Sequence, residues 1–199
     1  MRIASTRSGW IAKASSDSAT REASSDEALV RRIARGDQLA MRTLFARHQV
    51  FAYRFVLRIV RDEMLAEDVI SDVFLDVWRQ AGAFEGRATV STWLLAIARY
   101  KAVSALRRRT EMQIDCETPA TIADPAADPE AALQEKNRSE ILRRCMAKLS
   151  PEHGQIIDLV YYHGKSVREV AGIVRIPEPT VKTRMFYARK RLAELVTAA

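Results

Sequence analysis

The sequence contains little cysteine and no long hydrophobic run. Its two cysteines, Cys116 and Cys145, are too few and too far apart for a Cys-x-x-Cys metal site or a disulfide framework. The apolar runs are short and interrupted by charge, so we expect no membrane insertion. A reducing compartment is the simplest interpretation, and we expect a cytoplasmic protein.

Motifs for catalysis and cofactor binding are also missing. The three histidines, His48, His153 and His163, are isolated from one another in the sequence. No glycine-rich phosphate loop follows a strand pattern, and no metal-ligand spacing is present. The sequence therefore predicts no enzyme activity, no cofactor and no metal site.

Positive charge is in excess and unevenly distributed. The 32 Lys and Arg residues outnumber the 25 Asp and Glu residues, which gives a net charge of +7 and favours a polyanionic partner such as nucleic acid. The segment from Glu111 to Glu135 holds seven acidic residues and no Lys or Arg. This segregation predicts two basic modules joined by an acidic linker.

Helical periodicity dominates the sequence from Asp26 onward, so we predict an all-α fold of two small helical domains. Residues 1–25 have the composition of a disordered tail, with a weak transit peptide as the alternative. We expect domains at 26–109 and 130–199, and a flexible linker at 110–129 that includes Cys116. Asp26 and Asp37 are expected to cap the first two helices. The next two helices are predicted at about 65–80 and 91–109.

The last part of the sequence predicts two helices with helix-turn-helix spacing. The helices span Val167–Val174 and Pro179 to about Leu195, and Ser166 with Glu169 forms a capping box before the first. A helical hairpin without a DNA role is the alternative.

A helical wheel divides the second of these helices into two faces. The predicted core face contains Val181, Met185, Ala188, Leu192 and Leu195. The opposite face has Phe186 at its centre, which folding does not explain but which could pack on thymine methyl groups in a major groove. Arg184 lies beside the core face, so we expect it to pair with an acidic residue of the preceding helix.

The predicted 65–80 helix also has a distinctive outer face. Its buried face contains Leu65, Ala66, Val69, Ile70, Val73 and Val77. Leu75 lies opposite within a rim of polar residues and Trp78, which is typical of a protein docking site. A lone exposed leucine beside a covered tryptophan is an equally good interpretation.

The predicted 91–109 helix carries five positive charges and no acid from Arg99 to Arg109. Phe84, Trp93 and Tyr100 lie near this basic cluster, and such a combination can stack and track unpaired bases. A solvated charged face is the alternative. Trp93 itself is better assigned to the core than to base stacking.

Three stretches resemble extracytoplasmic-function sigma factors, the small RNA polymerase sigma subunits of the sigma-70 family. They are AEDVISDVFLDVWRQAGAF, STWLLAIARYKAVSALRRR and LSPEHGQIIDLVYYHGKSVREVAGIVRIPEPTVKTRMFYARKRL. The resemblance runs from Glu27 to Leu195. It implies binding to core RNA polymerase, through the coiled coil of the largest subunit and the flap, and to promoter DNA. It also implies DNA melting at the promoter without nucleotide hydrolysis and control by an anti-sigma factor.

The helical wheels and the resemblance together assign three sets of site residues. The polymerase-binding set is Asp68, Ser71, Asp72, Leu75 and Trp78. The set for the −10 promoter element is Phe84, Arg87, Arg99, Tyr100, Lys101, Ser104, Arg107 and Arg108. The set for the −35 element is Arg175, Pro179, Thr180, Lys182, Thr183, Phe186, Tyr187 and Lys190.

Several positions depart from the common pattern of these sigma factors. Tyr100 and Ser104 stand where Asn and Asp are frequent, so the −10 base preference cannot be transferred. Arg175 and Pro179 replace frequent glycines, and Gly154 replaces a common arginine. The main rival function is a transcriptional regulator that binds duplex DNA and never engages polymerase. Such a protein has no need of the Leu75 surface.

Overall fold

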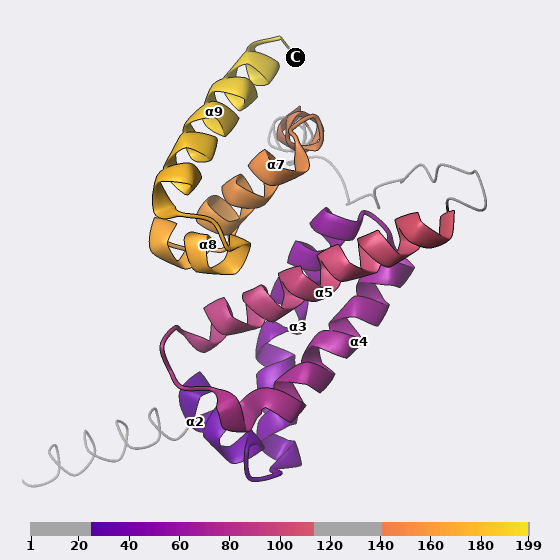
Figure 1. The fold of residues 1–199 in the computed structure, drawn as a ribbon, viewed down its shortest axis with the longest axis vertical. Coiled ribbons are helices and arrows are strands. Elements are labelled where there is room, and N and C mark those ends of the chain that lie inside the picture. Colours follow the sequence, from indigo (N-terminus) through magenta and orange to yellow (C-terminus); the bar gives the residue numbers. More distant parts are fainter. Residues whose placement is uncertain (1–24, 114–140, 199) are drawn as a thin grey trace, which may run out of the picture.

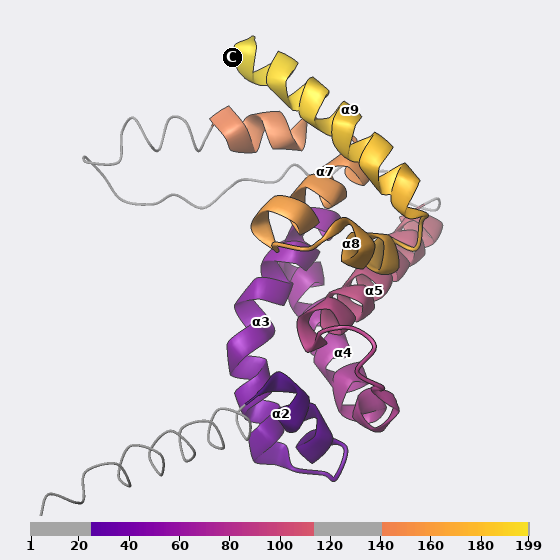
Figure 2. The same cartoon turned by 90° about the vertical axis from the view of Figure 1, so that its left-hand side faces the viewer.

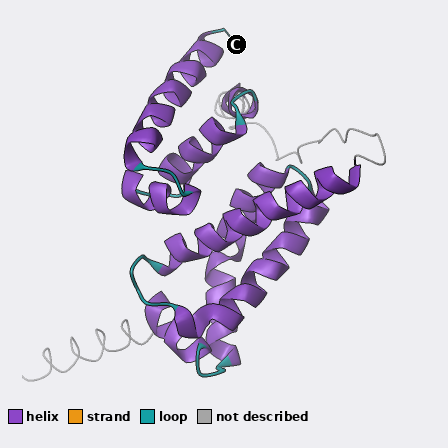
Figure 3. Cartoon of the chain, viewed as in Figure 1, coloured by secondary structure: helices purple, strands orange, loops and turns teal. Residues whose placement is uncertain are grey.

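The computed structural model describes residues 25–113 and 141–198, and within them every regular element is helical (Figure 3). The predicted all-α class is therefore confirmed. The predicted tail, Cys116 and nearly all of the predicted linker lie outside the described residues.

The helices form two lobes (Figure 1). The N-terminal lobe contains α2 (Asp26–Ile33), α3 (Gln38–Val60), α4 (Glu63–Gln80), the short 3₁₀ turn η1 (Ala81–Ala83) and α5 (Val90–Gln113). The C-terminal lobe contains a helix at 141–147, α7 (Pro151–Ile157), the π-helical turn η2 (Asp158–Tyr162), α8 (Val167–Val174) and α9 (Glu178–Thr197).

Side-chain caps fix most of the helix starts. The Asp37 carboxylate accepts hydrogen bonds from the backbone N–H groups of Leu39 and Ala40, as predicted. The predicted capping box of Ser166 and Glu169 is present at α8. The predicted cap at Asp26 is wrong, because Ser25 has the extended backbone and accepts from Ala28 instead.

Apolar faces of α3, α4 and α5 pack together to form the core of the N-terminal lobe, and α2 covers one end of α3. The predicted inner face of α4 is buried, apart from the half-buried Leu65. Phe74 is also buried, which the wheel did not predict. Phe45 of α3 covers it edge-on, with ring centroids 4.7 Å apart.

In the C-terminal lobe α9 packs across α7 and α8. Val181 and Ala188 are buried, while Met185, Leu192 and Leu195 are half-buried against the core. The predicted core face of α9 is thus confirmed. The chain leaves α8 through Arg175, whose left-handed backbone (φ 56°) is the conformation that favours glycine at a helix end.

The two lobes share one hydrophobic core. Buried residues of α8 and α9, including Ile173 and Val181, belong to the same apolar cluster as those of α3, α4 and α5. Helix α5 packs against α8, and α3 packs against α7 (Figure 2). The sequence predicted two separate modules. Helical patterns within each module could not reveal that the two pack against each other.

We predict that Gly154→Ala stabilises the protein. Gly154 lies within α7, and a Cβ atom built there meets nothing within 4 Å. Alanine should raise the free energy of unfolding by about 0.5–1 kcal/mol through its helix propensity. Gly36→Ala is the contrasting variant, because Gly36 has a φ of +84° that an L side chain tolerates poorly. Urea unfolding should show a higher free energy of unfolding for Gly154→Ala and a lower one for Gly36→Ala. A lower value for both variants would contradict the prediction.

Candidate polymerase and nucleic-acid interfaces

The outer face of α4 presents the predicted docking residues. Asp68, Ser71, Asp72 and Leu75 are all exposed, and 45% of Leu75 is accessible to solvent. Trp78 is half-buried and packs against the core. The surface is therefore an exposed leucine in a polar rim, with the tryptophan partly covered at its edge.

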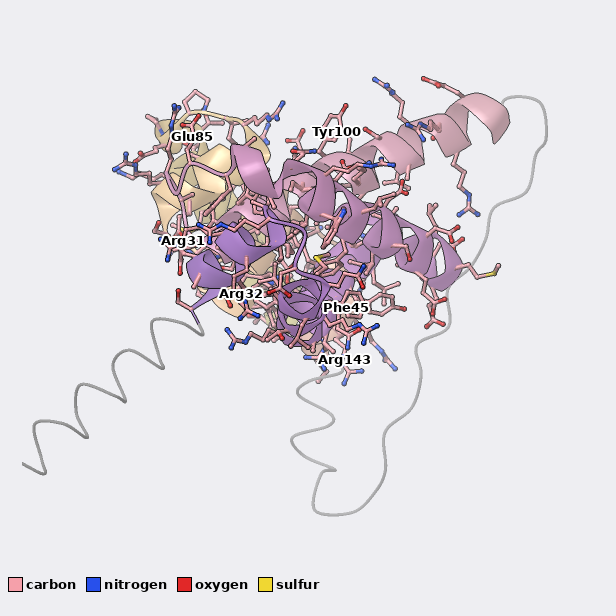
Figure 4. All side chains as sticks on the ribbon, turned by 90° about the horizontal axis from the view of Figure 1, so that it is seen from below. Arg31, Arg32, Phe45, Glu85, Tyr100 and Arg143 are labelled. Atoms are coloured by element: carbon pink, nitrogen blue, oxygen red, sulfur yellow. The ribbon has the colours of Figure 1, made fainter. Side chains whose placement is uncertain are left out.

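The predicted −10 surface lies along α5. Arg99, Tyr100, Val103, Ser104 and Arg107 line a shallow concavity of about 160 Å³. Tyr100 is 60% exposed and stands out from α5 (Figure 4). A basic concavity with an exposed aromatic ring is suited to the stacking and backbone contacts that unpaired bases require.

Three other residues of the predicted −10 set contact side chains of the protein itself, and a fourth is exposed. Lys101 Nζ lies 2.9 Å from a carboxylate oxygen of Asp76 on α4, and both side chains are largely buried. Phe84 packs against Trp93 with ring centroids 4.9 Å apart, and both are half-buried. Arg87 forms an exposed ion pair with Glu85 in the loop between α4 and α5. Arg108 is exposed near the end of α5.

Arg99 is held by the opposite lobe. Its Nε donates a hydrogen bond to the side-chain carbonyl of Gln155 in α7, over 3.1 Å. Burial lowers the pKa of the Arg99 guanidinium, and the nearby charges of Arg175 and Arg184 lower it further. Positive charges of the two predicted DNA surfaces therefore lie close together in this arrangement.

The outer face of α9 matches the predicted −35 surface. Phe186 and Tyr187 are 58% and 54% exposed, and their rings form an edge-to-face pair 5.5 Å apart. Thr183 donates a hydrogen bond to the Pro179 carbonyl, so its oxygen stays available as an acceptor. Further members of the set are exposed Arg175, Pro179, Lys182 and Lys190, and half-buried Thr180.

Arg184 pairs with an acidic residue, as predicted from its position beside the core. Its guanidinium lies 2.8 Å from a carboxylate oxygen of Glu152. Glu152 belongs to α7 and not to α8, so the expected partner helix was wrong. The ion pair ties α9 to α7.

Sequence reasoning missed a group of polar residues that join the lobes. Thr92 in α5 donates a 2.6 Å hydrogen bond to Glu169 in α8, and Lys165 donates a 2.7 Å hydrogen bond to Ser91. The bond from Thr92, followed by the backbone N–H of Ser166, lowers the pKa of Glu169 to about 2. The capping motif identified Glu169, but nothing in the sequence signals a partner 77 residues away.

The described residues include neither a membrane-spanning helix nor a metal-binding cluster. None of the helices in 25–113 and 141–198 is long and apolar enough to span a bilayer. Over the same residues there is no group of three His, Cys, Asp or Glu side chains placed to hold a metal ion.

Two helical lobes, one ending in a helix-turn-helix with a basic and aromatic outer face, define a DNA-binding transcription protein. Comparisons with known proteins place it more narrowly. Family models for sigma-70 region 2 and sigma-70 region 4 match residues 44–111 and 139–192. ECF RNA polymerase sigma factor SigK of Mycobacterium tuberculosis is 31% identical over 172 residues, which cover 83% of this chain and 90% of SigK.

Other relatives and solved structures agree. SigK of a further Mycobacterium species (strain KMS) is 31% identical over 165 residues, covering 80% of this chain and 84% of that protein. CnrH in complex with the cytosolic domain of CnrY has a TM-score of 0.63 at 24% identity, covering 87% of this chain and 97% of CnrH. Sigma factor RpoE from Bartonella quintana, in complex with the anti-sigma factor NepR, has a TM-score of 0.64 at 24% identity, covering 77% and 94%. These two structures share the fold.

The chain belongs to the extracytoplasmic-function sigma factors of the sigma-70 family. It is a non-enzymatic initiation factor that binds core RNA polymerase and promoter DNA. Region 2 lies in the N-terminal lobe and region 4 in the C-terminal lobe.

We predict that the Glu169 carboxyl group titrates near pH 2 and that Thr92→Val raises its pKa towards the ordinary value of 4.5. The pKa is lowered in the folded protein, so stability from the ionised carboxylate is present above pH 4.5 and is lost as pH falls from there through about 2. Ser166→Ala is the matched control. The Ser166 hydroxyl contributes less than Thr92 to lowering this pKa, so its loss should raise the pKa less. Carboxyl ¹³C NMR measures both values, and an unchanged pKa in Thr92→Val would exclude the bond in solution.

Proposed function

We propose that the exposed α4 residues Asp68, Ser71, Asp72 and Leu75, with Trp78 at their edge, bind the coiled coil of the largest polymerase subunit. The single observation that carries this proposal is Leu75, a large apolar side chain that is 45% exposed at the centre of a polar rim. Covering such a side chain with a partner lowers the free energy of the complex, and the surrounding polar groups give the contact specificity. The flap of the polymerase is the expected second contact, through region 4.

The α5 concavity is proposed to hold unpaired bases of the −10 element. Tyr100 offers a stacking face, while Arg99, Arg107 and Arg108 supply positive charge for the backbone. Phe84, Arg87, Lys101 and Ser104 complete the set. Capture of bases out of the stack offsets the cost of unpairing them, so melting needs no hydrolysis by this chain.

The outer face of α9 is proposed to read the −35 element as duplex. Lys182 and Thr183 are placed to reach base edges, and Phe186 and Tyr187 to contact thymine methyl groups. Lys190 and Arg175 are placed to contact phosphates, which position the helix without reading sequence. Pro179 and Thr180 lie at the start of α9, where a recognition helix approaches the groove.

Regulation and location are proposed from the same relatives. RpoE is solved with the anti-sigma factor NepR, and we propose that an anti-sigma factor also controls this chain. We propose that the protein acts in the cytoplasm, where polymerase and chromosome are found. The domain limits proposed are 26–109 for region 2 and 130–199 for region 4, with a linker at 110–129. The family models match residues 44–111 and 139–192, and the first of them ends two residues beyond the proposed limit at 109.

We predict that Leu75→Asp abolishes transcription directed by this sigma factor. A carboxylate in the apolar centre of the docking surface should weaken core polymerase binding at least about tenfold. Met64→Asp is the control, because Met64 is 80% exposed on the same helix but outside the docking set. Pull-down with purified core polymerase and run-off transcription over fragmented genomic DNA provide the two measurements. If Leu75→Asp supports full transcription in this assay, the polymerase contact does not depend on Leu75 and lies elsewhere on the chain.

A second prediction concerns Arg175. Glycine in its place should remove the strain of the left-handed backbone and so raise the free energy of unfolding by up to about 1 kcal/mol. Duplex DNA binding should weaken several-fold, and the slope of log K against log salt should fall by about 1 because one phosphate contact is lost. Arg61→Gly is the matched control, since Arg61 has the same left-handed backbone (φ 54°) at the end of α3. Equal salt slopes for the two variants would remove Arg175 from the DNA interface.

A further inference from the structure

The shallow concavity on α5 has a chemically uniform lining. Its polar side chains, Arg99, Tyr100, Ser104 and Arg107, all carry hydrogen-bond donors, and its remaining side chain is the apolar Val103. Among the described residues no carboxylate lines it. We propose that this concavity selects thymine among unpaired bases, with its donors directed at the thymine carbonyl oxygens and Val103 against the thymine methyl group. The inference rests on the proposed −10 function and names the base that this surface prefers.

Most of the lining residues share one face of α5. Tyr100, Val103, Ser104 and Arg107 occupy positions i, i+3, i+4 and i+7, which a helix places on the same side. Tyr100 is 60% exposed and Val103 is 40% exposed, so neither side chain is needed to fill the core (Figure 4). Tyr100 and Arg107 are about 10 Å apart along the helix axis. The face therefore has a ring for stacking a base and a guanidinium two turns further on.

The two arginines of the lining keep N–H donors that the protein does not use. Arg99 donates from Nε to Gln155 over 3.1 Å, but its two terminal nitrogens have no hydrogen-bond partner among the described residues. Arg107 has an exposed ion pair with Glu111 over a long distance of 3.6 Å. Such a pair at the surface contributes little and is easily exchanged for another acceptor. Both guanidinium groups can therefore donate to an acceptor on a base.

The hydroxyl group of Ser104 is also uncommitted. Hydroxyl groups within helices commonly donate to the carbonyl four residues earlier, as those of Ser71 and Thr110 do here. Ser104 forms no such bond, nor any other side-chain hydrogen bond within the described residues. Its oxygen can therefore accept a hydrogen bond while its proton is donated elsewhere. The concavity thus offers several donors but few acceptors, all of them hydroxyl oxygens.

This excess of donors discriminates between bases that carry amino groups and bases that carry carbonyl groups. Adenine and cytosine present an exocyclic amino donor, which would meet the donors of the arginines and lose its own hydrogen bond. Thymine instead presents two carbonyl oxygens, O2 and O4, as acceptors for these groups. Its single N–H donor, at N3, can be satisfied by a hydroxyl oxygen of Ser104 or Tyr100. Thymine is therefore favoured over adenine and cytosine.

Val103 favours thymine over guanine, the other base with a carbonyl acceptor. Guanine O6 and N7 suit a guanidinium, so the arginines alone would accept it. Val103, however, lies one turn after Arg99 and one turn before Arg107, which places an exposed apolar side chain among the donors. In thymine the C5 methyl group is adjacent to O4, so a single edge presents an apolar group beside an acceptor. Guanine has no apolar group on this edge and would leave Val103 uncovered.

The test measures the affinity of the full chain for short fluorescein-labelled homopolymers of thymidine, deoxyuridine and deoxycytidine, by fluorescence anisotropy at one salt concentration. The three strands have equal length and backbone charge, so their affinity ratios report the bases. We expect thymidylate to bind about threefold more tightly than deoxyuridylate, which lacks only the methyl group. We expect it to bind at least about tenfold more tightly than deoxycytidylate, whose amino group replaces O4. Guanine is compared with thymine as a single guest within the deoxycytidylate strand.

Two pairs of variants assign the selectivity to the concavity. Val103→Ala should bring the ratio of thymidylate to deoxyuridylate affinity close to one. Val50→Ala is its control, because Val50 is 54% exposed on α3 and outside the −10 set. Arg107→Ala should lower the ratio of thymidylate to deoxycytidylate affinity. Arg108→Ala removes the same charge from the next residue, outside the concavity, and should weaken all three strands equally. Circular dichroism should show the wild-type helix content in all four variants.

The outcomes separate this inference from the function on which it rests. Equal affinities of the wild-type chain for thymidylate and deoxyuridylate, or tighter binding of the guanine guest, would overturn the selection of thymine. An unchanged methyl preference in Val103→Ala would overturn the contact with Val103. Either result can occur while run-off transcription with core polymerase is intact, and then only the inference fails. The expected ratios support the inference even if the chain fails to start transcription, a result that would overturn the proposed function alone.

Discussion

The carboxylate of Glu169 is the interaction on which the arrangement of the molecule most depends. One oxygen accepts from the Ser166 backbone and hydroxyl at the start of α8, and the other accepts from Thr92 of α5. The same side chain therefore starts the first helix of the helix-turn-helix and attaches it to region 2. The local cap and the contact between lobes are coupled, because the cap holds the carboxylate in the orientation that Thr92 requires.

Charge is used in two different ways in the lobes. Ion pairs such as Arg109 of α5 with Asp62, the N-cap residue of α4, and Arg184 with Glu152 link neighbouring helices, so these cations serve structure. The cations at Arg107, Lys182 and Lys190 lie on outer faces, where nucleic acid can reach them. A net charge of +7 alone does not separate these uses. Only the position of each cation relative to the packed faces does.

Patterns along single helices were predicted well from the sequence. The capping box at Ser166, the limits of α8, the inner face of α4 and the core face of α9 all follow from local periodicity, and each is found in the structure. The exposed position of Phe186 follows from the same geometry. These features depend on residues three or four positions apart, which a helix brings together whatever the rest of the chain does.

Features that depend on distant residues could not be predicted in this way. Phe74 is buried because Phe45 of another helix covers it. Arg184 pairs with Glu152 of α7 because α9 crosses that helix. The capping error at Asp26 has a different origin. Ser25 and Asp26 are both good caps, and the extended backbone falls on the serine, which leaves Asp26 to pair with Arg47 and His48. Where two neighbouring residues cap a helix equally well, their contacts with other helices decide which of them becomes the cap.

The pair of Arg58 and Asp158 has a consequence for the order in which the chain assembles. The two residues are 100 positions apart, whereas the bundle of α2 to α5 forms from contacts much closer in sequence. Short-range contacts form faster because they close smaller loops, so region 2 should fold first and accept region 4 afterwards. On the ribosome, region 2 would emerge folded with its basic helix uncovered, and region 4 could dock on it only after α8 has been synthesised.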